Sequence, residues 1–184
     1  MRILLSSVLI LFSTVAMGQE TAIIGGLNWA RGDVEVGTTD IDLDPQIGFQ
    51  GGVRYYHDFQ GQMVWRLGAT LNYSGAEATI GTSNIEFTTM HIMAPITIQY
   101  NASEQFGFFG GLGAGILIDD DCELNGQTCN NFTDFESFVL DLQFGVAARF
   151  SDFIAAEVYY QLALTDIADN TDIGIVGIQL LFLM

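Results

Sequence analysis

Three oxygen-bearing side chains, Asp121, Glu123 and Asn125, have the spacing of the first half of a calcium-binding loop. Counted from Asp121 they occupy positions one, three and five, and a glycine follows at position six, as such loops require. The bidentate acid expected at position twelve is missing, because Phe132 stands there. We therefore expect a solvated acidic loop with a weak calcium candidate, and no other metal or cofactor.

The two histidines are the candidates for acid–base chemistry. His57 lies beside a short predicted turn, and His91 follows Ser83 and Glu86 in the chain. A Ser–His–acid site needs a base within hydrogen-bonding distance of the nucleophile and a third group that orients the base. The spacing does not indicate that arrangement, so we expect no catalytic residue and interpret His91 as an inward-facing structural histidine.

The stretch Met63–Ser74 alternates strictly between two kinds of side chain. Its odd positions are apolar, with Trp65 and Tyr73 near the two ends, and its even positions are small or polar and include Arg66. Such alternation is typical of a strand with two different faces. The polar set is too small and glycine-rich for a water-exposed surface, so we interpret it as a packed interior and the apolar set as a lipid-facing exterior.

Eight alternating segments of this kind follow one another. Long acidic connections alternate with short ones, which is typical of outer-membrane barrels. The sequence therefore predicts an all-β fold, an eight-stranded antiparallel up-and-down transmembrane β-barrel with both termini in the periplasm. The predicted strands are Thr21–Ala30, Gln46–His57, Met63–Ser74, Phe87–Tyr100, Phe106–Ile118, Phe138–Phe150, Phe153–Leu164 and Ile173–Met184; the long connections are Arg31–Pro45, Gly75–Glu86, Asp119–Glu136 and Thr165–Asp172.

Five charged residues have inward parity in these strands: Arg54, Arg66, Asp141, Arg149 and Glu157. Arg54 and Arg66 flank one short turn, and Arg149 and Glu157 flank another, on strands that face each other across a narrow lumen. We expect Arg54 and Arg66 to lie nearly opposite each other, in one interior charge cluster centred on Glu157. Tyr56 and Tyr159 should fill its remaining hydrogen bonds. Asp141 is expected to lie too far along its strand to join.

The first 18 residues have the three regions of a secretory signal peptide: Arg2, an apolar run that ends at Phe12, and small residues up to Gly18. We expect export and cleavage after Gly18, which divides the chain into a signal peptide (1–18) and a barrel domain (19–184). In an exported chain the only two cysteines, Cys122 and Cys129, are expected to form one disulfide.

Composition narrows the function further. The net charge is −17 and lysine is absent, which excludes the basic surface that nucleic-acid binding requires. Although 49% of the residues are hydrophobic, no stretch after the signal peptide is long and apolar enough for a transmembrane helix.

At three places the chain resembles the outer-membrane β-barrel family common in Bacteroidota, often labelled "porin family". These are HIMAPITIQY (91–100), FGFFGGLGAG (106–115) and YYQLALTDI (159–167). Two features depart from that family: Ala94 replaces the isoleucine before Pro95, and the chain ends in Met184 where an aromatic residue is usual. The resemblance implies a barrel in the outer membrane and implies no reaction. Because a proline cannot donate to a strand ladder, we expect a bulge or a missing bond at Pro95.

These features together predict a small non-enzymatic outer-membrane barrel that presents acidic extracellular loops, with an envelope-structural or adhesion role. A lipid-modifying enzyme and a narrow pore for small solutes remain as alternatives. The expected partners are outer-membrane lipid and lipopolysaccharide, and the barrel-assembly machinery during insertion.

Overall fold

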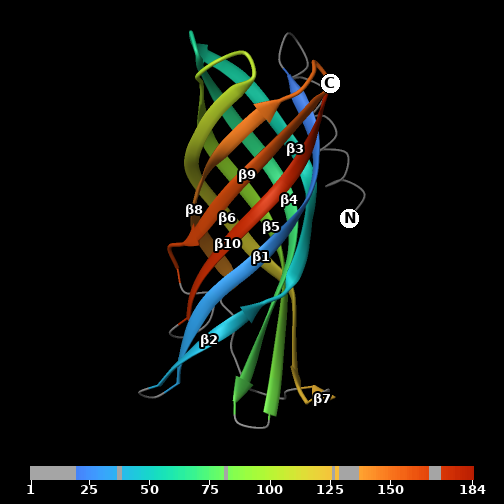
Figure 1. Ribbon diagram of the computed structural model, residues 1–184, viewed down its shortest axis with the longest axis vertical. Helices are drawn as coiled ribbons and strands as arrows, with labels where there is room; N and C mark the ends of the chain where they lie inside the picture. The colour runs from blue at the N-terminus through green and yellow to red at the C-terminus, as the bar shows by residue number, and fades with distance from the viewer. Residues whose placement is uncertain (1–19, 37–38, 81–82, 126, 129–136, 166–170) are drawn as a thin grey trace, which may run out of the picture.

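The computed structural model describes residues 20–36, 39–80, 83–125, 127–128, 137–165 and 171–184. These residues form one antiparallel sheet that curves into a barrel (Figure 1). Its strands are β1 (Thr21–Val36), β2 (Thr39–Pro45), β3 (Ile47–Gln60), β4 (Met63–Ile80), β5 (Ser83–Asn101), β6 (Phe106–Leu124), β7 (Gln127–Thr128), β8 (Phe138–Arg149), β9 (Ile154–Ala163) and β10 (Thr171–Leu183).

The barrel closes where the last strand pairs with the first. β10 and β1 pair antiparallel from Ala22–Leu183 to Val34–Thr171, so that the sheet has no open side. The wall consists of β1, β3, β4, β5, β6, β8, β9 and β10, and the short strands β2 and β7 lie beyond it at one end. The predicted closed eight-stranded antiparallel barrel is therefore confirmed.

The two ends of the barrel differ strongly. The C-terminus and the start of β1 lie at the end with the short connections, which is the upper end in Figure 1. At the other end β4 and β5 continue as a long hairpin that extends past the rest of the barrel. The prediction of loops at Gly75–Glu86 and at the start of Asp119–Glu136 was wrong: the described residues 75–80, 83–86 and 119–124 are paired strand, because β4, β5 and β6 keep their ladders beyond the barrel wall.

The side chains sort by parity as the alternation predicted. In β4 the exposed fraction is 42% for Leu67 and 1% for Arg66, its neighbour. The apolar side chains that point outward form a continuous belt, and the polar ones fill the lumen. Among the described residues there is no helix long and apolar enough to cross a membrane.

Pro95 interrupts the ladder between two strands of the wall. The pairing of β4 with β5 passes from Leu67–Ile96 directly to Thr70–Met93, and the two positions between them are skipped. On its other side Pro95 still lies opposite Gly113 of β6. The ladder is therefore interrupted at Pro95, as expected. The interruption lies on the β4 side of β5 and not on the β6 side.

Parts of the long connections predicted at Asp119–Glu136 and Thr165–Asp172 lie outside the described residues, and two further predictions fall there wholly or partly. The signal peptide, residues 1–18, is one of them. Cys129 is the other; Cys122 is described, near the outer end of β6 and opposite Phe87, and no described cysteine is free. The bond between Cys122 and Cys129 therefore stays a prediction.

Reduction of that bond should leave the barrel folded. The two cysteines enclose a short segment outside the wall, so the bridge should remove only about 2.5 kcal/mol of loop entropy from the unfolded chain. We expect unheated protein to keep its compact gel mobility after reduction. Labelling of thiols in denatured, non-reduced protein tests the bond itself, and two reactive thiols would disprove it.

Candidate functional site

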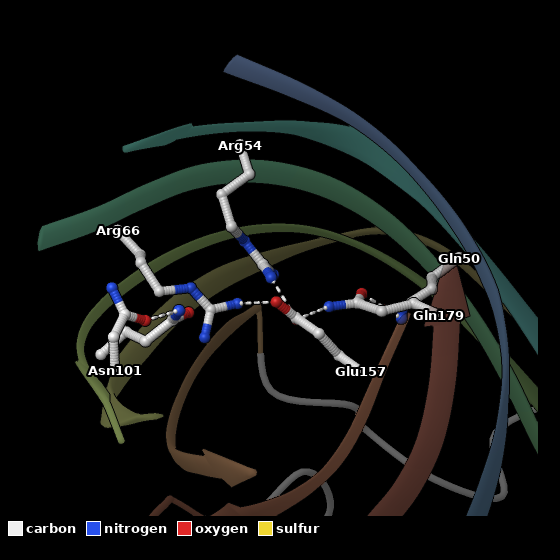
Figure 2. Close-up of polar contacts among 7 residues, drawn as sticks. Gln50, Arg54, Arg66, Asn101, Glu157 and Gln179 are labelled. Carbon is white, nitrogen blue, oxygen red and sulfur yellow. Dashed lines mark hydrogen bonds and ion pairs between the residues drawn. The ribbon is translucent and has the colours of Figure 1, made fainter. Parts of the chain in front are cut away.

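The lumen contains a charge cluster at which two arginines meet one glutamate. Arg54 on β3 donates to Glu157 Oε2 at 2.5 Å, and Arg66 on β4 donates to Glu157 Oε1 at 2.6 Å. Glu157 lies on β9, on the opposite side of the lumen, so that the two ion pairs cross the barrel (Figure 2). All three side chains are at least 97% buried. The cluster therefore joins opposite walls where water is nearly absent.

Two glutamines complete the hydrogen bonds of this cluster. Gln179 on β10 donates to Glu157 Oε2, and Gln50 on β3 donates to the amide oxygen of Gln179 at 2.7 Å. The chain from Gln50 through Gln179 to Glu157 is visible in Figure 2. Sequence reasoning did not include these glutamines in the cluster, although both have inward parity and that signal could have identified them.

Arg66 is held by aromatic rings as well as by Glu157. Its guanidinium carbon lies 3.7 Å from the centre of the Phe109 ring and 5.8 Å from that of Tyr56. Its Nε and Nη1 atoms have no hydrogen-bond partner. A ring face over a desolvated guanidinium compensates part of such a loss. The cluster thus fills the section of the lumen between β3–β4 and β9–β10.

Arg149 does not belong to this cluster, contrary to the prediction. It lies opposite Ala155 at the end of β8, two residue pairs nearer the short turn than the pair that Ala147 forms with Glu157. Its guanidinium instead donates to Glu20 at 2.8 Å and to the carbonyls of Ser151 and Asp152. These partners lie at the short turn. The side chains of Arg149 and Glu20 are each more than one third exposed there, so their pairing requires little desolvation.

The details of the predicted contacts also differ. Arg54 and Arg66 are diagonal neighbours, because Arg54 lies opposite Gly68 and Arg66 opposite Tyr56. Their like charges are tolerated because Glu157 bonds both. The hydroxyl of Tyr159, expected to join the cluster, has no partner, and Gln179 takes that place.

The calcium and histidine candidates are not assembled into sites by the fold. Asp121 and Glu123 lie on the extended strand β6, and Asn125, with φ of 52°, accepts a hydrogen bond from the Asn84 amide. Within the described part of the chain, no three His, Cys, Asp or Glu side chains are grouped as metal ligands. His91 is buried beside Asn72, whereas Glu86 has the opposite parity and faces outward. His57 lies at the other end of the barrel, where it lines a pocket at the mouth between the short turns.

That pocket lies between the short turns and has a volume of about 1160 Å³. Glu20, Tyr56 and Arg149 line it, and so does the buried Glu157. The charge cluster therefore forms the floor of the mouth on the side of the termini.

A second charged feature lies on the outer face beyond the barrel wall. Asp44 pairs with Glu77, Glu77 with Glu86, and Glu86 with Glu123, across β2, β4, β5 and β6. We call these four residues the acidic row. Directly paired residues point to the same side, and their neighbours Ala76 and Ile85 are buried inside, so the row points outward. Like charges placed directly opposite one another destabilise a sheet, which makes this row a place where bound cations would be favourable.

The comparisons with known proteins agree with this architecture. The family model described as outer membrane protein beta-barrel domain matches residues 4–180. The search of curated proteins gave no match. Among solved structures, the chain is similar to Ail, the attachment invasion locus protein of Yersinia pestis, in complex with the heparin analogue sucrose octasulfate. The identity is 16% and the TM-score 0.58, over 91% of this chain and 100% of that one.

Neisserial surface protein A is similar at 9% identity and a TM-score of 0.55, over 88% of this chain and 96% of that one. At these identities the likeness concerns the fold alone. The family match covers nearly the whole chain and agrees with the closed barrel and its apolar belt. The chain therefore belongs to the outer-membrane β-barrel family, and the protein is located in the outer membrane.

Proposed function

We propose that this protein is a non-enzymatic barrel that stabilises the outer leaflet of the outer membrane. In this proposal its acidic row binds divalent cations, which in turn bind the phosphate groups of neighbouring lipopolysaccharide. The observation that carries the proposal is the row itself, with four carboxylates in register on the face that points away from the barrel axis.

The closed lumen argues against the alternative of a narrow pore. An eight-stranded barrel has an interior just wide enough for side chains, and here Arg54, Arg66 and Glu157 occupy it with at most 3% of each side chain exposed. The histidine geometry offers no support for the alternative of a lipid-modifying enzyme, because His91 and Glu86 point to opposite faces of β5.

The position of the row fits an interaction with lipid headgroups. On β4 the outward side chains pass from Leu67 and Leu71 through Tyr73 to Glu77. Tyrosine at the end of an apolar belt is typical of the membrane interface. The first acid of β4 beyond it is thus expected at the level of the headgroups. Phosphates there would repel bare carboxylates, whereas a hard divalent cation binds oxygens from both partners.

Adhesion is a second candidate, which the fold likeness to Ail favours. That protein was seen with a sulfated sugar, a polyanion. Our chain has no lysine and a net charge of −17, so a polyanion would be repelled unless cations intervened. If this protein is an adhesin, its ligand should be cationic or bound through cations.

The experiment compares two variants of equal charge change in nanodiscs with lipopolysaccharide. One replaces Glu77, Glu86 and Glu123 of the row by glutamine, and the matched control replaces the exposed acids Asp58, Glu104 and Asp152 at the other end by their amides. With MgCl₂ present we expect the row variant to bind lipopolysaccharide roughly tenfold more weakly, about 1.4 kcal/mol. The control should bind like the original chain.

Removal of divalent cations by a chelator should reverse the difference in lipopolysaccharide binding between the two proteins. Without divalent cations the row should repel phosphates, so in EDTA the row variant should bind lipopolysaccharide more tightly than the original chain. If both proteins bind equally in MgCl₂ and in EDTA, the bridging role is wrong. If the original chain binds a basic peptide and the row variant does not, that result would instead favour adhesion.

A further inference from the structure

A second group of buried polar side chains lies in the lumen beyond the charge cluster, on β8 and β9. Asp141, Gln143 and Gln161 are 94% or more buried, and each has one side-chain oxygen without a hydrogen-bond partner. These atoms are Asp141 Oδ1, Gln143 Oε1 and Gln161 Oε1. Buried polar atoms are nearly always bonded, so three neighbouring exceptions require an explanation such as a bound ion or water.

The three side chains are close neighbours. Gln143 lies directly opposite Gln161, and Asp141 is two residues from Gln143 on the same face of β8. The Gln161 amide nitrogen lies 3.5 Å from Asp141 Oδ2, and it can only donate to that carboxylate. The orientation of this amide is thereby set, and its free atom is the oxygen. Each of the three side chains thus presents one buried acceptor oxygen that no hydrogen bond among the described residues satisfies.

The fold makes room for the carboxylate in particular. Asp141 lies opposite Gly113 of β6, and a Cβ added at Gly113 would come within 2.5 Å of both carboxylate oxygens. The carboxylate therefore occupies the space that the missing side chain leaves. The position of Asp141 is consequently fixed by the backbone of a neighbouring strand.

Asp141 has no counter-charge in contact with it. Among the described residues, no ion pair includes Asp141, and both lumen arginines are bonded to Glu157. Glu157 is four residues from Gln161 along β9, about 13 Å away at the usual rise per residue. A buried carboxylate is costly unless it is paired or bound to a metal.

We propose that Asp141, Gln143 and Gln161 bind one monovalent inorganic cation of the size of sodium. Asp141 supplies the charge, the two amide oxygens are neutral ligands, and water completes the shell, in keeping with the preference of hard cations for oxygen. A monovalent ion leaves the group neutral, whereas a divalent ion would leave an uncompensated positive charge buried. This site is independent of the acidic row and of lipopolysaccharide.

The test measures unfolding in urea of the refolded full chain in detergent, without lipopolysaccharide. NaCl is compared at equal concentration with tetramethylammonium chloride, whose cation is too large for the site. An ion that binds only the folded state should lower the unfolding constant by about tenfold for each tenfold rise in Na⁺ above its Kd. Asp141→Asn should lose this dependence, and Glu123→Gln, which removes an acid outside the lumen, should keep it.

If Asp141→Asn does not fold, Gln161→Met removes one oxygen and keeps the charge, and it should shift the Na⁺ dependence to higher concentration. Two results would overturn the site. One is that the original chain unfolds at the same urea concentration in both salts, which is the result expected if water or a proton, and not a cation, satisfies Asp141. The other is equal Na⁺ dependence in the original chain and in every lumen variant, which would place the ions on the outer surface.

Discussion

Replacement of Glu157 by glutamine is expected to destabilise the barrel by about 3–5 kcal/mol, the usual effect of removing one partner from a buried ion pair. The loss should fall at the upper end of that range, because Arg54 and Arg66 would both lose the one carboxylate with which they pair among the described residues. The measurement is the urea midpoint of unfolding for protein refolded in detergent.

The matched control is Glu123→Gln, which removes the same charge from an exposed position and should stay within about 0.5 kcal/mol. The double variant Glu157→Gln with Arg66→Met should recover part of the loss, because only one arginine then stays unpaired. Equal midpoints for Glu157→Gln and Glu123→Gln would mean that Glu157 is hydrated, and the interpretation as a pore would return.

Replacement of Gly111 by alanine is the second change with a large expected effect. A Cβ at Gly111 would lie 2.2 Å from the Ile96 carbonyl oxygen and 2.6 Å from the Thr97 Cα on β5. These are backbone atoms of the adjacent strand, so they cannot move without opening the β5–β6 ladder. We expect a loss of roughly 3 kcal/mol, at the upper end for overpacking, or failure to refold.

Gly110 supplies the control from the next position. Its Cβ would have only ordinary contacts at 3.8 Å, so Gly110→Ala should change the urea midpoint by no more than about 0.5 kcal/mol. If the two variants unfold at the same urea concentration, β5 and β6 do not approach each other as closely as described.

The fold could be predicted from the sequence because its signal is local. Alternation at Met63–Ser74 assigns each side chain to one of two faces, and a shift by one residue would expose Arg66 and bury Leu67. Eight such segments with alternating connection lengths leave few arrangements besides a closed barrel. Parity alone also placed Arg54, Arg66 and Glu157 in the lumen.

The fate of Arg149 could not be predicted in the same way. Its parity is compatible with the lumen, and its partner depends on the pairing register at the turn and on Glu20, which lies far away in sequence. The role of Gln179 depends likewise on the closure of β10 against β1 and β9. Contacts across the lumen depend on all the registers together, and no single segment encodes them.

The strand extensions at the outer end were missed for a different reason. Acidic and small residues are poor strand formers on average, so Gly75–Glu86 and Asp119–Glu136 were predicted as loops. In the structure the described residues 75–80, 83–86 and 119–124 continue ladders that the apolar segments have already started, and β4 and β5 pair without a gap from Thr70–Met93 to Ile80–Ser83. Tertiary pairing outweighed local preference there.

The unequal ends of the barrel also give it a direction of entry into a bilayer. At one end the crossing segments are compact turns with single acids such as Asp58 and Glu104, whereas at the other the hairpins carry several carboxylates, among them Glu77, Glu86 and Glu123. Moving charged groups through hydrocarbon is costly for each group. A chain that folds into a preformed vesicle should therefore send its turns across first and leave its acidic hairpins on the side from which it came, so that one orientation results without any machinery to choose it.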